Sequence, residues 1–183
     1  MKKRFVLFAA VLVAALMLFN LVACTPKDGK NTENSDTNST GESTAGNLEG
    51  SLEEIIEKIY KTADLEDSFK EFIENGTFYD AVTAEKTEYY LGKSDIEFEE
   101  ALASEPMIQP GAYSLVLVRV KEGANVEKIE NEIRENVNPT KWVCVGVKKE
   151  NVIVDSIDNI IILIMSDIAA QPLHEAFLAL GNK

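Results

Sequence analysis

A long polar stretch near the N-terminus determines which parts of this chain can fold around a hydrophobic core. Residues 25–50, TPKDGKNTENSDTNSTGESTAGNLEG, contain eight serines and threonines, four asparagines and four glycines, with almost no apolar side chains. A segment of this composition cannot offset the entropy that it loses on ordering, so we expect a disordered linker over residues 24–50. The remaining residues, 51–183, are enough for one domain with one core.

The chain begins with the pattern of a secreted protein. Three basic residues precede a fifteen-residue apolar run from Phe5 to Phe19, and small residues then lead to Cys24. This pattern predicts a signal peptide over residues 1–23. The ending Leu-Val-Ala-Cys resembles a bacterial lipobox, which implies a lipoprotein whose Cys24 thiol carries a diacylglycerol with acyl chains such as palmitate.

This reading of the N-terminus predicts a location. Two acyl chains suffice for stable anchoring, so we expect an extracytoplasmic domain that lipid anchors to the outer face of the cell membrane. The alternative is an uncleaved membrane helix, because Phe5 to Val22 reaches the ~18 residues that can span a bilayer. Asn20 interrupts that run and no basic cluster follows it, which favours cleavage.

Acidic residues dominate the first half of the predicted domain. The whole sequence carries 31 acidic and 18 basic residues, and residues 51–110 hold 16 acidic and 5 basic ones. The negative electrostatic potential of these residues argues against nucleic acid and anionic lipid headgroups as partners of this half of the domain. Solubility outside the cell explains the excess most simply, while a cationic partner surface or loosely held divalent cations stay open as alternatives.

Once Cys24 is lipidated, Cys144 is the only remaining cysteine, so we expect no intramolecular disulfide. Its surroundings, KWVCVGV, are apolar on both sides and predict a strand from Trp142 to Val147 that is buried on both faces. A thiol buried in this way is inert. We therefore interpret Cys144 as a structural residue that thiol reagents do not modify in the native domain.

Helical periodicity predicts four helices in the domain. Ser51 and Glu54 form a capping box ahead of the first helix. The second follows Asp64, a candidate cap, and ends at Asn75-Gly76. The last two are bounded by Gly123 and Pro139, and by Gln171 and Gly181.

Strand patterns predict a mainly antiparallel sheet of about five strands. Residues 94–108 are ambiguous because they contain both capping residues and strand alternation, and we favour a hairpin of 97–107 with 113–120. Three further strands are expected at 142–147, 152–154 and 160–165. Strands grouped in this way, and packed with N-terminal, middle and C-terminal helices, indicate the α+β class.

Four ordered blocks of the sequence also resemble a known family. The blocks EYYLG, ALASEPM, LVLVRVKEGANVEKIENEI and WVCVGVKKENVIVD are similar to an uncharacterised family of Gram-positive surface lipoproteins, catalogued as a domain of unknown function. The resemblance covers roughly residues 82–180. It implies an extracytoplasmic, lipid-anchored domain, and it implies no substrate, activity or site residue.

Few residues are suited to nucleophilic or metal chemistry. His174, in QPLHEAF, is the only histidine, it lies beside the apolar stripe of the last helix, and no G-x-S-x-G motif occurs. One histidine and one buried cysteine cannot supply four zinc ligands, so we expect neither a metal site nor a cofactor. The turn from Asp155 to Asn159 offers oxygen ligands for calcium but lacks the calcium-loop pattern.

Clustered carboxylates leave one catalytic alternative. Glu97, Glu99 and Glu100 follow Asp95, and a glycosidase needs one carboxyl group as acid and another as base or nucleophile. In a strand Glu97 and Glu99 would share one face. Because a chain so rich in acids produces such clusters by composition alone, we interpret this one as a solvated acidic face.

The sequence therefore predicts a lipid-anchored cell-surface protein, a noncatalytic binding or scaffolding module for an unknown cell-envelope protein or polymer. Tyr89 and Tyr90 are the candidate contact residues, because tyrosine buries area while keeping a polar tip. Packing at the edge of the core is the alternative for both tyrosines. The alternative function is a small envelope hydrolase that uses a carboxylate pair on glycan or peptide.

Overall fold

The computed structural model describes residues 48–181. The predicted signal peptide, Cys24 and all but the last residues of the predicted linker lie outside this range. The described elements are α1 (Leu52–Thr62), α2 (Asp67–Gly76), β1 (Thr77–Ala81), α3 (Thr87–Leu91), β2 (Glu100–Pro106), β3 (Ser114–Arg119), α4 (Val126–Asn136), the 3-10 helix η1 (Lys149–Asn151), β4 (Val152–Ile157), β5 (Ile160–Met165) and α5 (Ala170–Gly181).

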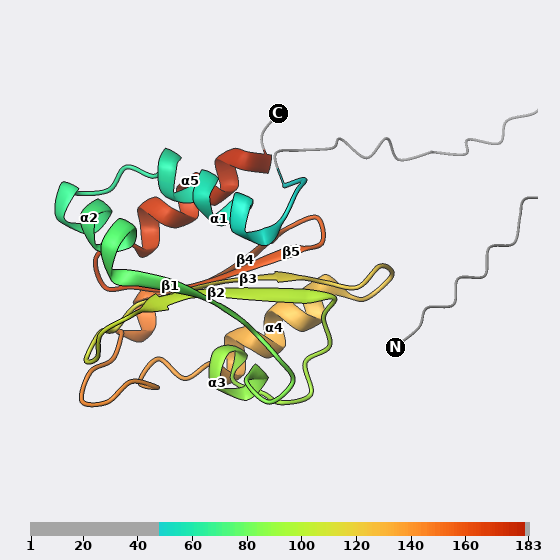
Figure 1. Ribbon diagram of the computed structural model, residues 1–183. Coiled ribbons are helices and arrows are strands. Elements are labelled where there is room, and N and C mark those ends of the chain that lie inside the picture. The colour runs from blue at the N-terminus through green and yellow to red at the C-terminus, as the bar shows by residue number, and fades with distance from the viewer. Residues whose placement is uncertain (1–47, 182–183) are drawn as a thin grey trace, which may run out of the picture. The chain divides into compact units, whose positions relative to one another are not determined.

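The five strands form one antiparallel sheet in the order β1-β2-β3-β5-β4. Helices α1, α2 and α5 lie on one face of the sheet, and α3 and α4 lie on the other (Figure 1). The fold therefore belongs to the α+β class, as predicted. Among the described residues, no helix combines the length and the apolar composition needed to cross a bilayer.

The central strands are buried on both faces, which explains their uninterrupted apolar sequences. Every residue of β5 from Ile160 to Met165 is buried. Successive side chains of a strand point to opposite faces, so Leu117 of β3 packs with α1 and α5, and its neighbour Val118 packs with α4. The sheet therefore has a separate hydrophobic core on each face.

Helix α1 begins with the predicted capping box. The amide of Glu54 donates to the Ser51 hydroxyl at 3.2 Å, and the Ser51 amide donates to the Glu54 carboxylate at 3.0 Å. The core also includes a residue ahead of this cap, because Leu48 is buried together with the apolar residues of α1. Arg119 holds this entry segment by donating from Nη2 to the carbonyl of Gly50 at 2.7 Å.

Most of the predicted elements are confirmed. The hairpin forms as β2 and β3, although β2 starts only at Glu100. The strand predicted at 152–154 continues to Ile157, and the one predicted at 160–165 is β5. Helix α2 begins at Asp67, and no side chain caps it, so Asp64 is not the cap that the sequence suggested.

Strand β1 was not predicted. It is five residues long, lies at an edge of the sheet, and exposes both Phe78 and Tyr79 in succession. A strand this short, with no alternation of buried and exposed residues, has no period-2 signal in its sequence. Its pairing with β2 determines its conformation.

The strand predicted from Trp142 to Val147 is wrong. The segment from residue 141 to 148 is irregular, with Trp142 and Val147 buried and Val143 71% exposed. Cys144 is exposed and has a φ of 62°, a left-handed conformation that interrupts an extended strand. Cys144 is therefore not the buried structural residue that the sequence predicted.

Local packing explains why this segment turns back. The amide of Val147 donates to the carbonyl of Pro139 at 2.8 Å. Gly146 comes so close to Thr140 that a Cβ at this position would lie 2.9 Å from the threonine methyl group. The apolar composition of KWVCVGV therefore reflects two buried anchors, Trp142 and Val147, at the ends of a loop.

The exposure of Cys144 gives a direct prediction. In a Cys24→Ala chain, Cys144 is the only thiol, and we expect a disulfide reagent such as dithiobis-nitrobenzoate to modify it in the native protein nearly as fast as in urea-unfolded protein. Stopped-flow absorbance measures both rates. A native rate far below the unfolded rate would show that Cys144 is buried after all.

Candidate functional site

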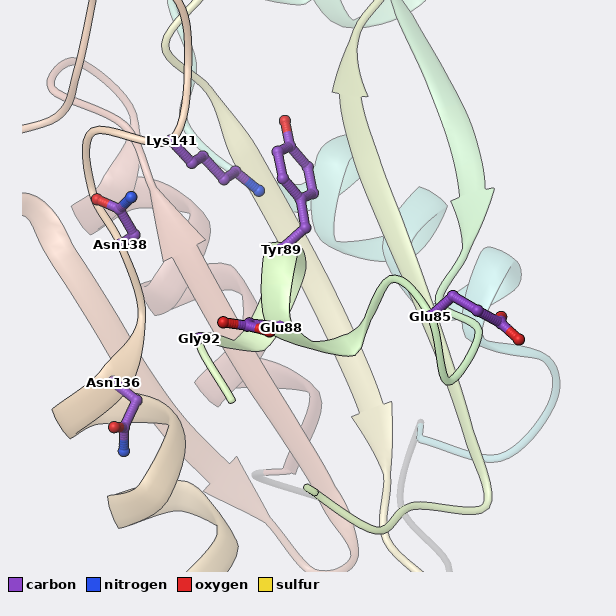
Figure 2. A pocket seen from close by; sticks show the side chains of 7 residues that line it. All are labelled: Glu85, Glu88, Tyr89, Gly92, Asn136, Asn138 and Lys141. Atoms are coloured by element: carbon purple, nitrogen blue, oxygen red, sulfur yellow. The ribbon is translucent and has the colours of Figure 1, made fainter. Parts of the chain in front are cut away.

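An open pocket lies between α3 and the segment that follows α4. Its volume is about 460 Å³, which is within the range of small-ligand sites. Figure 2 shows the side chain of Lys141 directed at Tyr89, while Glu85 lies apart from the other labelled residues. The pocket is lined by Glu85, Glu88, Tyr89, Gly92, Asn136, Asn138 and Lys141.

A buried ion pair holds Lys141 in place. Its Nζ lies 2.7 Å from Glu105 Oε1, and only 3% and 4% of the two side chains are exposed. Trp142 Nε1 donates to the other carboxylate oxygen at 3.1 Å, and Lys141 Nζ donates to the Ser114 hydroxyl at 3.3 Å. Burial lowers the pKa of Lys141, and the charge of Glu105 opposes that effect. Both buried charges therefore have hydrogen-bond partners, which compensate for their removal from water.

Three aromatic rings surround the ammonium group of Lys141. Its Nζ lies 4.5 Å from the ring centroid of Tyr89, 4.6 Å from that of Tyr90 and 5.2 Å from that of Trp142. The two tyrosine rings meet edge to face, with centroids 4.9 Å apart. A cation attracts the negative face of an aromatic ring, and the attraction is stronger when both groups are desolvated. Lys141 therefore fixes the position of these rings.

A second network fastens α3 to the edge of the sheet. The Tyr90 hydroxyl donates to Asp80 Oδ2 at 2.7 Å, and Lys86 Nζ binds the two oxygens of Asp80 at 2.6 and 2.8 Å. The hydrogen bonds from Lys86 and Tyr90 lower the pKa of Asp80, while burial raises the pKa of Tyr90 well above its usual value. A helix of five residues is not stable by itself, so these contacts determine where Tyr89 lies.

Gly92 brings the end of α3 against the end of α4. It follows α3 with a φ of 86°, and a Cβ at this position would lie 2.2 Å from the backbone carbonyl group of Asn136. Only glycine satisfies both the left-handed conformation and the close contact. Lys93 strengthens the contact by donating to Glu132 at 3.4 Å. The wall of the pocket that Asn136 provides depends on this contact.

Four polar groups at the pocket have no hydrogen-bond partner within the described residues 48–181. They are the Glu88 carboxylate, the Tyr89 hydroxyl, the side-chain oxygen of Asn136 and the side-chain nitrogen of Asn138. The other ends of both amides are used, because Asn136 donates to the carbonyl of Glu132 at 2.8 Å and Asn138 accepts from Thr140. All four groups belong to exposed side chains, so water can reach them, and a ligand that binds them would displace that water.

The structure separates the two tyrosines that the sequence singled out. Tyr89 is 45% exposed and lines the pocket. Tyr90 is 3% exposed and packs in the core between the sheet and α4, so it supports Tyr89 and does not itself form a contact surface. Cys24, the predicted lipidation site, lies outside the described residues.

Sequence reasoning missed Glu105 and Lys141. The sequence did contain a signal for Glu105. Alternate residues of a strand lie on the same face, so Glu105 of β2 shares a face with the buried residues Ala101 and Ala103. A carboxylate on a buried face needs a partner. Lys141 had no such signal, because its partner is 36 residues away and their contact depends on the loop that replaces the predicted strand.

The acidic cluster at residues 97–100 does not form the strand face that would pair two carboxylates. Only Glu100 belongs to β2, and its carboxylate accepts from Arg119 Nε at 2.7 Å. Glu97 lies 3.4 Å from Lys121 Nζ. Glu99 precedes the strand and is exposed. The cluster is therefore divided between separate surface interactions.

His174 is a half-buried helix residue, as predicted. Its Nε2 lies 2.7 Å from Asp155 Oδ2, with 16% of the histidine side chain exposed, and this contact joins α5 to β4. Within residues 48–181, no group of three or more His, Cys, Asp or Glu side chains is arranged to hold a metal ion.

The chain matches no protein-family model, no curated protein and no solved structure. Its function therefore has to be argued from the site itself.

The Lys141–Glu105 pair gives the second prediction. Glu105→Gln leaves a buried ammonium group without its counter-charge, and we expect the free energy of unfolding to fall by about 3–5 kcal/mol. Replacing both partners, in Glu105→Leu with Lys141→Met, should cost markedly less, because an apolar pair leaves no buried charge. Urea denaturation measures both effects.

Glu100→Gln is the matched control for this experiment. It removes an ion pair in which the glutamate side chain is half exposed, so we expect a change of about 1 kcal/mol or less. Equal losses in Glu105→Gln and Glu100→Gln would contradict a stabilising role for the buried pair.

Proposed function

We propose that this protein is a noncatalytic binding module, that lipid on Cys24 holds it at the outer face of the cell membrane, and that it binds a cell-envelope protein or polymer through the pocket at Tyr89. The N-terminal sequence supports the anchor and the location. The pocket supports the binding function.

The exposed ring of Tyr89 is the observation that carries the binding function. It is 45% exposed at the pocket, yet the Lys141 ammonium group and the edge-to-face contact with Tyr90 already fix it. A large side chain that is ordered before binding loses little entropy when it contacts a partner. Rigid tyrosines of this kind are among the residues that contribute most to binding.

The chemistry around Lys141 favours binding over catalysis. Its amine and the Glu105 carboxylate have hydrogen-bond partners in each other, in Ser114 and in Trp142. A general acid or base must come within hydrogen-bond reach of the substrate. Two groups this deeply buried and this fully paired are suited to holding the pocket in shape.

The anchor has its own test. We expect Cys24→Ala to abolish incorporation of radiolabelled palmitate and normal maturation, because the lipid needs the thiol. Cys144→Ala is the matched control, since it removes the other cysteine and should leave labelling unchanged. Equal labelling of the wild type and Cys24→Ala would overturn the lipid anchor.

The binding function is tested by capture from the native envelope. We expect the intact protein to retain an envelope component after cross-linking and detergent extraction, and we expect Tyr89→Ala to lose it, because the substitution removes the exposed ring. Tyr79→Ala is the matched control. Tyr79 is similarly exposed, at 37%, but it faces the charges of Glu53 and Glu57 on α1, across the sheet from the pocket. A capture profile that Tyr89→Ala leaves unchanged would overturn this site.

A further inference from the structure

The free polar groups of the pocket form a mixed set of donors and acceptors. The Glu88 carboxylate and the Asn136 side-chain oxygen accept hydrogen bonds, the Asn138 nitrogen donates them, and the Tyr89 hydroxyl does both. A ligand that satisfies such a set must itself donate and accept at neighbouring atoms. A hydroxyl group does so with one oxygen, which donates one hydrogen bond and accepts two.

The charges at the pocket exclude anionic ligands. Glu85 and Glu88 line it, and a hydrogen bond from Thr83 lowers the pKa of the Glu85 carboxyl, so this group is ionised at neutral pH. The positive charge of Lys141 does not compensate, because Glu105 neutralises it at 2.7 Å. The remaining field is negative, and it repels phosphate and carboxylate groups.

The position of Lys141 also disfavours a cationic ligand at the tyrosine ring. Its ammonium group already lies 4.5 Å from the centroid of Tyr89. This ammonium group therefore already occupies the position over the ring that a ligand cation would take. The exposed part of Tyr89 is therefore suited to the C–H groups of an uncharged ligand, which pack against an aromatic ring.

From these three constraints we infer that the pocket binds a neutral, polyhydroxylated sugar unit of a cell-envelope glycan. The inference rests on the proposed function and names the ligand class of the same site. A volume of about 460 Å³ accommodates one or two sugar rings, and the pocket is open to solvent, so a bound ring can belong to a longer polymer.

The chain contains a built-in reporter for this binding. Trp142 is the only tryptophan in the sequence, and its ring lies 5.2 Å from the Lys141 ammonium group that contacts Tyr89. A sugar that packs on Tyr89 changes the surroundings of this group. Binding should therefore change the fluorescence of Trp142 without any label.

The experiment titrates the full chain in detergent with two trisaccharides of equal length, neutral triacetylchitotriose and anionic trigalacturonic acid. Trp142 fluorescence and titration calorimetry follow the binding, so that a fluorescence-silent complex is also detected. We expect saturable binding of the neutral trisaccharide, and at least about tenfold weaker binding in Tyr89→Ala. Tyr79→Ala should bind as the wild type does.

A third variant separates hydrogen bonding from packing. Asn138→Asp replaces the donating nitrogen with a second acceptor, and we expect it to weaken binding of the neutral trisaccharide several-fold, because the sugar oxygen loses its donor. The fold should survive, since the oxygen that Asn138 uses to accept from Thr140 is retained. Urea denaturation of each variant checks this.

Three results would overturn the inference: no heat and no fluorescence change with the neutral trisaccharide, equal binding by Tyr89→Ala, or preference for the anionic trisaccharide. If envelope capture depends on Tyr89 but the trisaccharides do not bind, the proposed ligand class is wrong and the proposed binding function stands. The bound partner is then a protein. If capture is also independent of Tyr89, both the binding function of the pocket and its sugar ligand are contradicted.

Discussion

The ion pair between Lys141 and Glu105 joins two parts of the chain that are far apart in sequence, strand β2 and the loop that follows α4. Removing two charges from water is costly, and the cost is offset only where every remaining donor and acceptor is satisfied. Trp142 and Ser114 complete that requirement. Because the same ammonium group also faces the ring of Tyr89, the interaction that fixes the loop also fixes the pocket.

The two faces of the sheet are buried in separate hydrophobic cores, and these cores have different roles. The core beneath α1 and α5 contains Leu48, where the described chain begins, and it includes Leu52 within the capping box of α1 and Ile55 directly after it. The core on the other face contains Tyr90 and Trp142, which support the pocket. The strands β3 and β5 contribute alternate side chains to each core, so the two faces share one rigid layer without sharing side chains.

Much of the fold could be predicted because its strongest signals are local. The capping box at Ser51 and the apolar run of β5 depend on neighbouring residues alone. The segment around Cys144 could not be predicted, because an apolar run of six residues is equally compatible with a buried strand and with a loop anchored at both ends. The same contrast between local and tertiary signals holds for the site. Tyr89 could be proposed from the chemistry of its own side chain, whereas Lys141 acquires its role only from tertiary contacts.

The entry of the chain at Leu48 has a mechanical consequence. A pull on the chain from its N-terminal side first acts on the burial of Leu48 and on the hydrogen bond between Arg119 and the carbonyl of Gly50. Arg119 is itself held by Glu100, so the load passes into strands β2 and β3. The same two strands carry Glu105 and Ser114, which hold Lys141 at the Tyr89 pocket, so a load applied at Leu48 reaches the pocket through the sheet.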